Sequence, residues 1–211
     1  MPDTPAVTFE LLGWPPDGPT LRLHHERFSY AGKFVMSSTG KAVARARTDD
    51  DEYESGDADA GIVSAGLDSS ERADLPYATD VLAAVAFNED RTDASTLWLR
   101  YVTVDRAHRG RGLGPELVSF VRDAALERGY DRLQIAVNNP YAYDALWKAD
   151  FGFTGETTGI AELVLEHPTR ATTETYRRGL ESFLERDLTG GERAFLEHRL
   201  EVGPPSRIDS P

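Results

Sequence analysis

The sequence predicts a mixed α/β (α+β) fold with a mostly antiparallel central sheet, flanking helices and a C-terminal helical hairpin. The first half of the chain consists mainly of short apolar runs of strand length, separated by breaks that contain Gly and Pro. Two longer apolar runs between residues 81 and 104 enclose a polar, turn-rich stretch, which is typical of an antiparallel hairpin. After residue 115 the apolar residues recur at the spacing of a helix with one buried face.

Four strands are expected in the N-terminal half of the chain. They cover residues 6–12, 20–28, 33–37 and 41–47. The acidic residues 48–61 include few large apolar side chains, so this segment cannot bury enough surface to offset its ordering entropy. We expect a solvated loop there, because a cation-binding loop, the alternative, would need ligand spacing that this segment lacks.

Strands and helices alternate from residue 81 onward. In chain order we expect the hairpin over 81–104, a glycine-rich loop, a helix over 115–128, a strand over 132–137, a short helix closing on Gly152 and Phe153, and a strand over 159–167. Gly129 stands where a helix C-terminal cap is expected. This pattern predicts one main domain over residues 1–168.

The C-terminal residues 169–211 form a separate helical extension in this prediction. Tyr176, Leu180, Phe183 and Leu184 share one helical face, and a break at Gly190 and Gly191 leads into a second helix. Thr189 and Glu192 have the spacing of a capping box. We expect a helical hairpin that packs on the main domain or makes a homodimer.

Composition and charge exclude several classes of protein. The chain has 211 residues, a formal net charge of −13 and no cysteine, so disulfides and thiolate sites are excluded. Phosphate contacts need a basic face, so binding to nucleic acid is disfavoured. No apolar run could span a bilayer, and the N-terminus lacks the features of a secretory signal. We therefore expect a cytoplasmic location and no role at a membrane.

The excess of acid is itself informative. Asp and Glu number 36 against 23 Lys and Arg, and only Lys33, Lys41 and Lys148 are lysines. An acidic, lysine-poor surface that stays soluble in high salt is typical of a halophilic protein. The competing interpretation is a surface that attracts a cationic substrate. No metal site is expected, because His24 and His25 are the only adjacent histidines and neighbouring strand residues point to opposite faces.

Residues 108–117, HRGRGLGPEL, carry the clearest chemical signal in the chain. Three glycines and two arginines lie between a predicted strand and a predicted helix. A helix N-terminus attracts anions through its free N–H groups, and glycines let the backbone approach the anion closely. Arg109 and Arg111 can add charge-assisted hydrogen bonds, and Pro115 suits the first helical position. The pattern predicts a phosphate-binding loop, although a plain glycine-rich turn would share part of it.

The glycine order separates this loop from two common phosphate-binding motifs. No Gly-Lys-Ser/Thr follows it, and Gly110, Gly112 and Gly114 run G-x-G-x-G rather than G-x-G-x-x-G. Residues 102–118, VTVDRAHRGRGLGPELV, instead resemble motif A of the GCN5-related N-acetyltransferase (GNAT) family, with its Arg-x-x-Gly-x-Gly core at Arg109, Gly112 and Gly114. Residues 138–153, NNPYAYDALWKADFGF, resemble motif B. The resemblance covers residues 80–167.

The resemblance implies a cofactor and the residues that hold it. In this family the anion is the pyrophosphate of acetyl-CoA, which the backbone N–H groups of residues 109–114 would bind. The strand from Val102 to Val104 would pair with the pantetheine arm, and the N–H of Val104 would face the acetyl carbonyl. Asn138, preferred to Asn139, would contact the cofactor arm. The cofactor set implied by the resemblance is Val102, Val104, Arg109, Gly110, Arg111, Gly112, Leu113, Gly114 and Asn138.

The resemblance further implies direct transfer of an acetyl group to an amine. The acceptor would be a small molecule or a protein amine. An acid must protonate the departing thiolate, and a base must take a proton from the amine. Leu146 and Trp147 occupy the family's Leu-Tyr slot, so we assign the acid to Tyr143, with Tyr141 as the other candidate. Glu89 is the candidate base, with Asp90 and Glu26 behind it. The alternative function is an acyl-CoA-binding regulatory module without catalysis.

Overall fold

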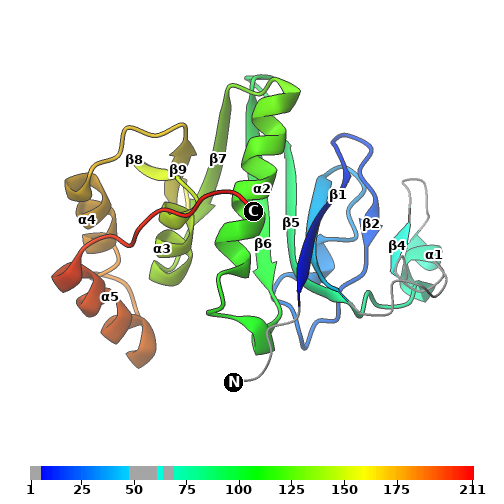
Figure 1. Ribbon diagram of the computed structural model, residues 1–211, viewed down its shortest axis with the longest axis horizontal. Coiled ribbons are helices and arrows are strands. Elements are labelled where there is room, and N and C mark those ends of the chain that lie inside the picture. Colours follow the sequence, from blue (N-terminus) through cyan, green and yellow to red (C-terminus); the bar gives the residue numbers. More distant parts are fainter. Residues whose placement is uncertain (1–5, 48–60, 64–68) are drawn as a thin grey trace. The chain divides into compact units, whose positions relative to one another are not determined.

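The protein is described from a computed structural model, which covers residues 6–47, 61–63 and 69–211. The chain divides into two compact units. The first unit contains the residues up to 89 together with 99–117, and the second contains residues 90–98 and 118–211. Strand β6 (Thr96–Val104) and helix α2 (Leu113–Arg128) each begin in one unit and end in the other (Figure 1).

An antiparallel sheet organises the first unit. Its strands lie in the order β1 (Val7–Gly13), β3 (Gly40–Ala46), β5 (Val81–Glu89) and β6. β3 pairs antiparallel with β1 and with β5, where Ala42 is opposite Val85 and Ala44 is opposite Ala83. A separate two-stranded ribbon joins β2 (Thr20–Leu21) to β4 (Ile62–Val63), and α1 (Ser69–Asp74) follows it.

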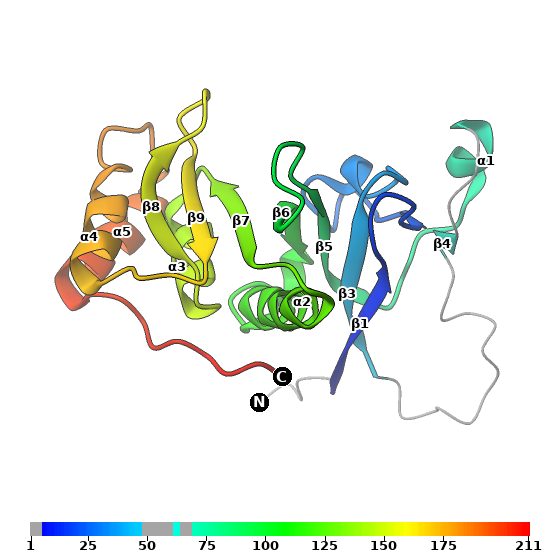
Figure 2. The same ribbon diagram turned by 90° about the horizontal axis from the view of Figure 1, so that it is seen from above.

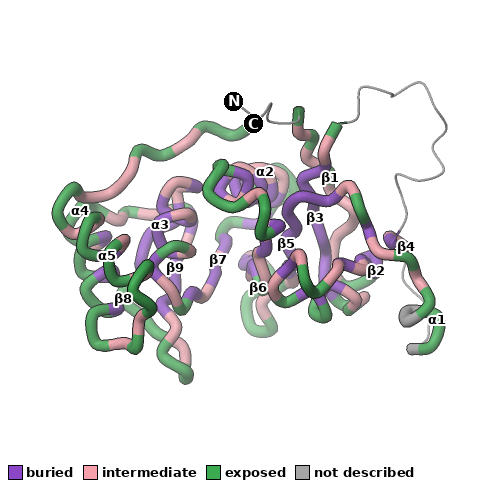
Figure 3. Tube along the Cα trace, turned by 90° about the horizontal axis from the view of Figure 1, so that it is seen from below, coloured by how far each residue is buried: buried purple, intermediate pink, exposed green. Residues whose placement is uncertain are grey.

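The core of the first unit lies around β3 and β5, which are buried along almost their whole length (Figure 3). Every residue from Val81 to Phe87 is buried, as expected for an apolar run of seven residues in a central strand. The side chain of Leu21 on β2 and those of Leu23, Phe28 and Phe34, from the segment between β2 and β3, pack into this core. This packing fixes the segment that precedes β3, although it forms little regular structure.

The second unit contains three antiparallel strands with helices. β7 (Arg132–Val137), β9 (Leu163–His167) and β8 (Gly152–Thr157) lie in that order, and both pairings are antiparallel. Helix α3 (Pro140–Lys148) connects β7 to β8, and α4 (Thr173–Glu181) packs beside β8 (Figure 2). Helix α5 (Gly190–Val202) contacts both α3 and α4.

A buried carboxylate fastens the C-terminal helices to α3. Asp144 on α3 is 2% exposed, its Oδ1 accepts a hydrogen bond from the Tyr176 hydroxyl at 2.8 Å, and it forms an ion pair with Arg199, whose Nε lies 2.8 Å from Oδ1. Lys148 Nζ lies 3.1 Å from the same carboxylate. Two cations therefore balance the buried negative charge of Asp144, and a hydroxyl donates a hydrogen bond to it. A buried carboxylate requires such partners.

The predicted fold class is confirmed, but two of the predicted strands are wrong. Only Thr20 and Leu21 of the expected strand 20–28 are in a strand, since Arg27 and Phe28 both donate backbone hydrogen bonds to the carbonyl of His24 and close a turn. The expected strand 33–37 is absent, because residues 31–33 form a 3₁₀ turn after Tyr30, which has a left-handed backbone (φ 59°). The expected strand 159–167 begins only at Leu163, and Gly152 and Phe153 begin β8.

The helix boundaries follow most of the sequence signals. Helix α2 ends at Arg128, and Gly129 adopts a left-handed conformation (φ 102°) that suits a C-terminal cap. Thr189 and Glu192 form the expected capping box. Helix α2 begins at Leu113, so Pro115 is its third residue rather than its first. Proline is still tolerated there, because the N–H groups of the first turn have no partner within the helix.

The described residues leave other predictions open. The two predicted domains, 1–168 and 169–211, stay a prediction. Tyr176, Leu180 and Phe183 are buried within the second unit, and homodimer formation likewise stays a prediction. The acidic stretch 48–60 lies outside the described residues. Among the helices that the structure describes, none has both the length and the apolar character to cross a membrane.

Candidate functional site

The anion-binding loop runs from the end of β6 to the start of α2, and we use this name for residues 109–114. A 3₁₀ turn over Arg106–His108 follows Asp105 and leads into the loop. Gly110 (φ 78°) and Gly112 (φ 92°) both adopt the left-handed conformation that L side chains rarely adopt. The first bond of α2 runs from the N–H of Glu116 to the carbonyl of Gly112 at 3.1 Å. The N–H groups of the first turn are therefore available to an anion.

The three glycines of the loop serve different needs. A Cβ on Gly110 would meet no atom within 4 Å, so glycine is needed there for its backbone conformation alone. A Cβ on Gly112 would lie 3.0 Å from Oε1 of Glu116, a flexible side chain. A Cβ on Gly114 would lie 3.4 Å from the Val104 side chain, which is an ordinary contact. Gly110 and Gly112 thus shape the loop, and Gly114 is the glycine that alanine could replace.

The carboxylate of Asp105 forms the base of the loop. It accepts a hydrogen bond from the Ala107 N–H at 2.9 Å and from Arg27 Nε at 2.7 Å, and the side chain is 5% exposed. Burial alone would raise the pKa of Asp105, but the Ala107 N–H and the Arg27 guanidinium outweigh it and hold the pKa below its ordinary value. The carboxylate therefore stays charged, and Arg27 neutralises it close to the loop.

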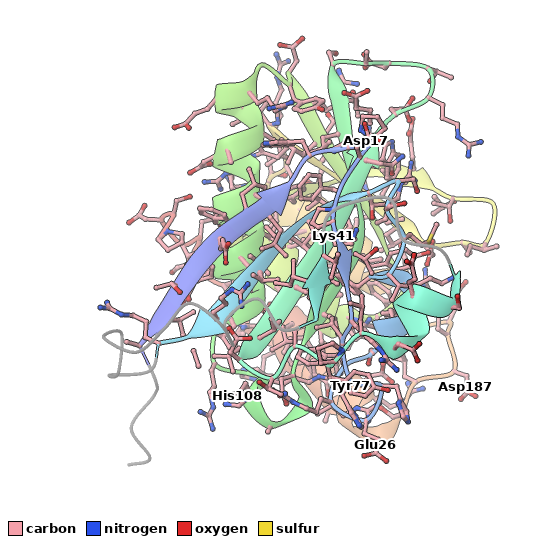
Figure 4. The ribbon with its side chains drawn as sticks, turned by 90° about the vertical axis from the view of Figure 1, so that its right-hand side faces the viewer. Asp17, Glu26, Lys41, Tyr77, His108 and Asp187 are labelled. Atoms are coloured by element: carbon pink, nitrogen blue, oxygen red, sulfur yellow. The ribbon has the colours of Figure 1, made fainter. Side chains whose placement is uncertain are left out.

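Arg27 joins three segments of the first unit. Besides Asp105 it contacts the carbonyls of Thr79 and Val81, at 3.0 and 3.2 Å, just at the start of β5. Its own carbonyl accepts the N–H of Arg106 at 3.0 Å. Figure 4 shows Glu26, Tyr77 and His108 at the same end of this unit, while Lys41 lies within the sheet. Sequence analysis missed Arg27, since no local pattern marks its contact with a residue 78 positions away.

The predicted cofactor residues of β6 and the loop lie together in the first unit. Val102 and Val104 are partly buried on β6, and Leu113 is 5% exposed at the start of α2. Arg109 and Arg111 are exposed on the loop. An exposed, left-handed glycine loop at a helix N-terminus fits a pyrophosphate, and Thr103, between the two valines, buries a hydroxyl that has no partner among the described residues. The individual assignments stay predictions.

Asn138 and Asn139 are described within the second unit. The Asn139 side chain accepts the N–H of Ala142 at 2.9 Å and caps α3, so its amide already has a structural task. Asn138 directly follows β7 and is exposed. Its carbonyl accepts a hydrogen bond from Arg186 at 3.0 Å. These contacts favour Asn138 over Asn139 as the residue whose amide can reach a ligand, and this role stays a prediction.

Tyr143, the predicted acid, belongs to the core of the second unit. It is 0% exposed, and its hydroxyl donates to the Tyr176 carbonyl at 3.1 Å. Its ring lies 5.9 Å from that of Phe183. Burial raises the pKa of Tyr143 well above its ordinary value. These contacts describe a packing role and give no support to proton donation, which stays a prediction.

The other catalytic candidates are more accessible. Tyr141, in the first turn of α3, is 47% exposed, and its ring lies 4.6 Å from that of Phe195. Glu89 is exposed at the end of β5. Its predicted role as base stays a prediction. In the parts of the chain that the structure describes, no three His, Asp or Glu side chains gather into a group that could hold a metal ion.

Comparison with known proteins identifies the family. The sequence pattern of the Acetyltransferase (GNAT) family matches residues 45–153, which is more than half of the 211 residues. The chain therefore belongs to the acetyltransferase (GNAT) family. None of the curated proteins compared with the chain matched it.

Solved structures give weaker likenesses. Nourseothricin acetyltransferase is 16% identical, with a TM-score of 0.43 over 76% of this chain and 97% of that chain. A GCN5-related N-acetyltransferase from Kribbella flavida is 20% identical, with a TM-score of 0.41 over 62% and 68%. An N-acetyltransferase from Staphylococcus aureus Mu50 is 17% identical, with a TM-score of 0.40 over 61% of this chain. The match spans 66% of the Staphylococcus aureus protein, just under two thirds.

Proposed function

We propose that the protein transfers the acetyl group of acetyl-CoA directly to an amine. The geometry of the anion-binding loop carries this proposal, because two left-handed glycines at the start of α2 form a cradle that fits a pyrophosphate. Backbone N–H groups of residues 109–114 would hold the pyrophosphate, the strand from Val102 to Val104 would pair with the pantetheine arm, and Asn138 would contact the arm. Acetyl-CoA supplies the activated acyl group.

The reaction requires one nucleophile and two proton transfers. The neutral amine attacks the thioester carbonyl carbon, the carbon–sulfur bond breaks, the amine loses a proton and the thiolate gains one. The N–H of Val104 would donate to the carbonyl oxygen as negative charge develops on it. Glu89 is our candidate for the base and Tyr143 for the acid, while water is the alternative proton donor for the thiolate.

Amine-dependent release of free CoA tests the proposal. The assay is performed in molar KCl, as the acid-rich composition suggests, with small amines and with peptides that carry a free N-terminus or a lysine. CoA release that rises only when an amine is added, and that is lost in Gly112→Glu, supports acetyl transfer. No release with any amine, despite binding of acetyl-CoA, would overturn it.

A second candidate function is an acyl-CoA-binding module without catalysis. The observation in its favour is the burial of Tyr143 together with Trp147 in the Leu-Tyr slot, which leaves no accessible motif B hydroxyl at that position. Tyr143→Phe separates two roles in an active enzyme. A fall in kcat of about 100-fold or more would assign Tyr143 as the acid, and a kcat close to wild type would leave it as a packing residue.

A further inference from the structure

The two arginines of the anion-binding loop have different surroundings. Arg109 Nη2 donates to the hydroxyl of Ser29 at 3.0 Å, and its Nε points to the carbonyl of Val104 at 3.4 Å. The guanidinium of Arg111 is exposed and makes no hydrogen bond or ion pair with the residues that the structure describes. One arginine is therefore held by the protein, and the other is available to an incoming anion.

The residue that holds Arg109 is itself fixed. Ser29 lies two residues after Arg27, which is bound to Asp105, Thr79 and Val81. Between them, Phe28 is 1% exposed in the core of the first unit. The segment 27–29 thus reaches both ends of residues 105–109, through Arg27 at Asp105 and through Ser29 at Arg109. Such a double attachment holds a glycine-rich loop that would otherwise sample many backbone conformations.

We infer that Ser29 is a positioning residue for the anion-binding loop, acting through Arg109, and that Arg111 is the arginine that contacts the phosphates. This inference rests on the proposed acetyl-CoA site. It assigns a role to a residue 80 positions from Arg109 in the sequence, outside the glycine motif. Phosphate binding by Arg111 is a direct charge contact, which salt weakens, whereas the task of Arg109 is to limit loop conformations, which salt affects little.

The test measures the dissociation constant of acetyl-CoA, by calorimetry over a series of KCl concentrations, for Ser29→Ala, Arg109→Gln, their double variant and Arg111→Gln. Ser29→Ala and Arg109→Gln should each weaken binding by about threefold to tenfold, the effect of one hydrogen bond. The double variant should be no weaker than Arg109→Gln alone, because both changes remove the same contact. Arg111→Gln should weaken binding and also flatten its salt dependence.

Matched control variants, and the melting temperature of each variant, distinguish a loss of acetyl-CoA binding from a loss of folding. Ser38→Ala and Arg47→Gln change exposed residues of the same unit and should leave the affinity unchanged. Additive losses in the double variant, or a flattened salt dependence in Arg109→Gln equal to that of Arg111→Gln, would overturn the inference. Absence of acetyl-CoA binding by the wild type would instead overturn the proposed function. If the wild type binds acetyl-CoA and Ser29→Ala binds it with the same affinity, the inference is overturned and the proposed function is not.

Discussion

The guanidinium of Arg27 and the carboxylate of Asp105 form an ion pair at 2.6 Å, in which the Asp105 side chain is 5% exposed and the Arg27 side chain 33% exposed. The pair connects the turn before the 3₁₀ segment 31–33 to the end of β6, immediately before the anion-binding loop. A buried carboxylate that loses its partner is costly, so this contact supports the part of the first unit on which the loop depends.

Arg27→Gln should lower the free energy of unfolding by about 1–3 kcal/mol, because it leaves the Asp105 carboxylate buried without a cation. The double variant Arg27→Gln/Asp105→Asn should recover most of that loss, since no charge is then left unpaired. Urea unfolding of the two variants and the wild type measures this coupling. Equal loss in the single and double variants would show that the charge pair is not the cause.

The same pair predicts a dependence on pH. Because the pKa of Asp105 is held below its ordinary value in the folded protein, its stabilising effect is present above the ordinary Asp range and is lost as pH falls through the folded-state pKa. The difference in unfolding free energy between the wild type and Asp105→Asn should therefore shrink below about pH 4. A difference that is constant from pH 7 to pH 3 would contradict this expectation.

Lys41 predicts a second dependence on pH, in the alkaline range. Its ammonium is buried and donates to the carbonyls of Met36 and Thr39, at 2.7 and 2.9 Å, and burial lowers its pKa from 10.5 to about 8. Above that pH the unfolded chain binds more protons than the folded one, so stability rises with pH. Relative to Lys41→Met, the wild-type free energy of unfolding should rise by at most about 1.4 kcal/mol per pH unit between pH 8 and 10. Parallel pH profiles of the unfolding free energy for the wild type and Lys41→Met would contradict this expectation.

Removing the charge of Glu116 should increase the affinity for acetyl-CoA. Its carboxylate lies over Gly112, 3.0 Å from where a Cβ would stand, at the helix N-terminus that we assign to the pyrophosphate. A carboxylate there is favourable to the free helix but repels a bound phosphate. Glu116→Gln should tighten acetyl-CoA binding by about twofold to tenfold. The exposed Glu127, in the last turn of α2, provides the matched control Glu127→Gln, which should leave the affinity unchanged. Weaker binding by Glu116→Gln would refute the assignment.

Gly179 on α4 tests the packing role of Tyr143. A Cβ at this position would overlap the Tyr143 hydroxyl and ring, so Gly179→Ala should destabilise the second unit by about 1–3 kcal/mol. At Gly190, the first residue of α5, a Cβ would meet no atom within 4 Å, and Gly190→Ala should change stability by no more than about 0.5 kcal/mol. Equal melting temperatures for the two variants would contradict this packing.

Elements with a strong local signal could be predicted from the sequence. The run from Val81 to Phe87 is apolar throughout and forms a buried strand, and the Thr189–Glu192 capping box forms as expected. The predicted strand over residues 20–28 was wrong. Its apolar residues alternate like those of a strand, but the hydrogen bonds to the His24 carbonyl close a turn there. These local bonds act together with the burial of Leu23 and Phe28 in the core of the first unit, a tertiary contact that the alternation does not reveal.

The site could be predicted only in part for the same reason. The anion-binding loop is contiguous in sequence, so its glycines and arginines were found from spacing alone. Arg27 and Ser29 reach the loop across about 80 positions of chain, and no periodicity marks such contacts. The burial of Tyr143 depends on packing against α4, which helical spacing alone does not reveal.

Calorimetric titration of acetyl-CoA into the wild type and Gly112→Glu, in molar KCl, tests the central claim most directly. Gly112 has φ 92° and borders Glu116, so a second carboxylate there strains the loop and repels the pyrophosphate. We predict binding of about micromolar affinity by the wild type and at least a 100-fold loss in the variant. Equal affinities, with both proteins folded, would contradict the assignment of residues 109–114 as the site of the pyrophosphate.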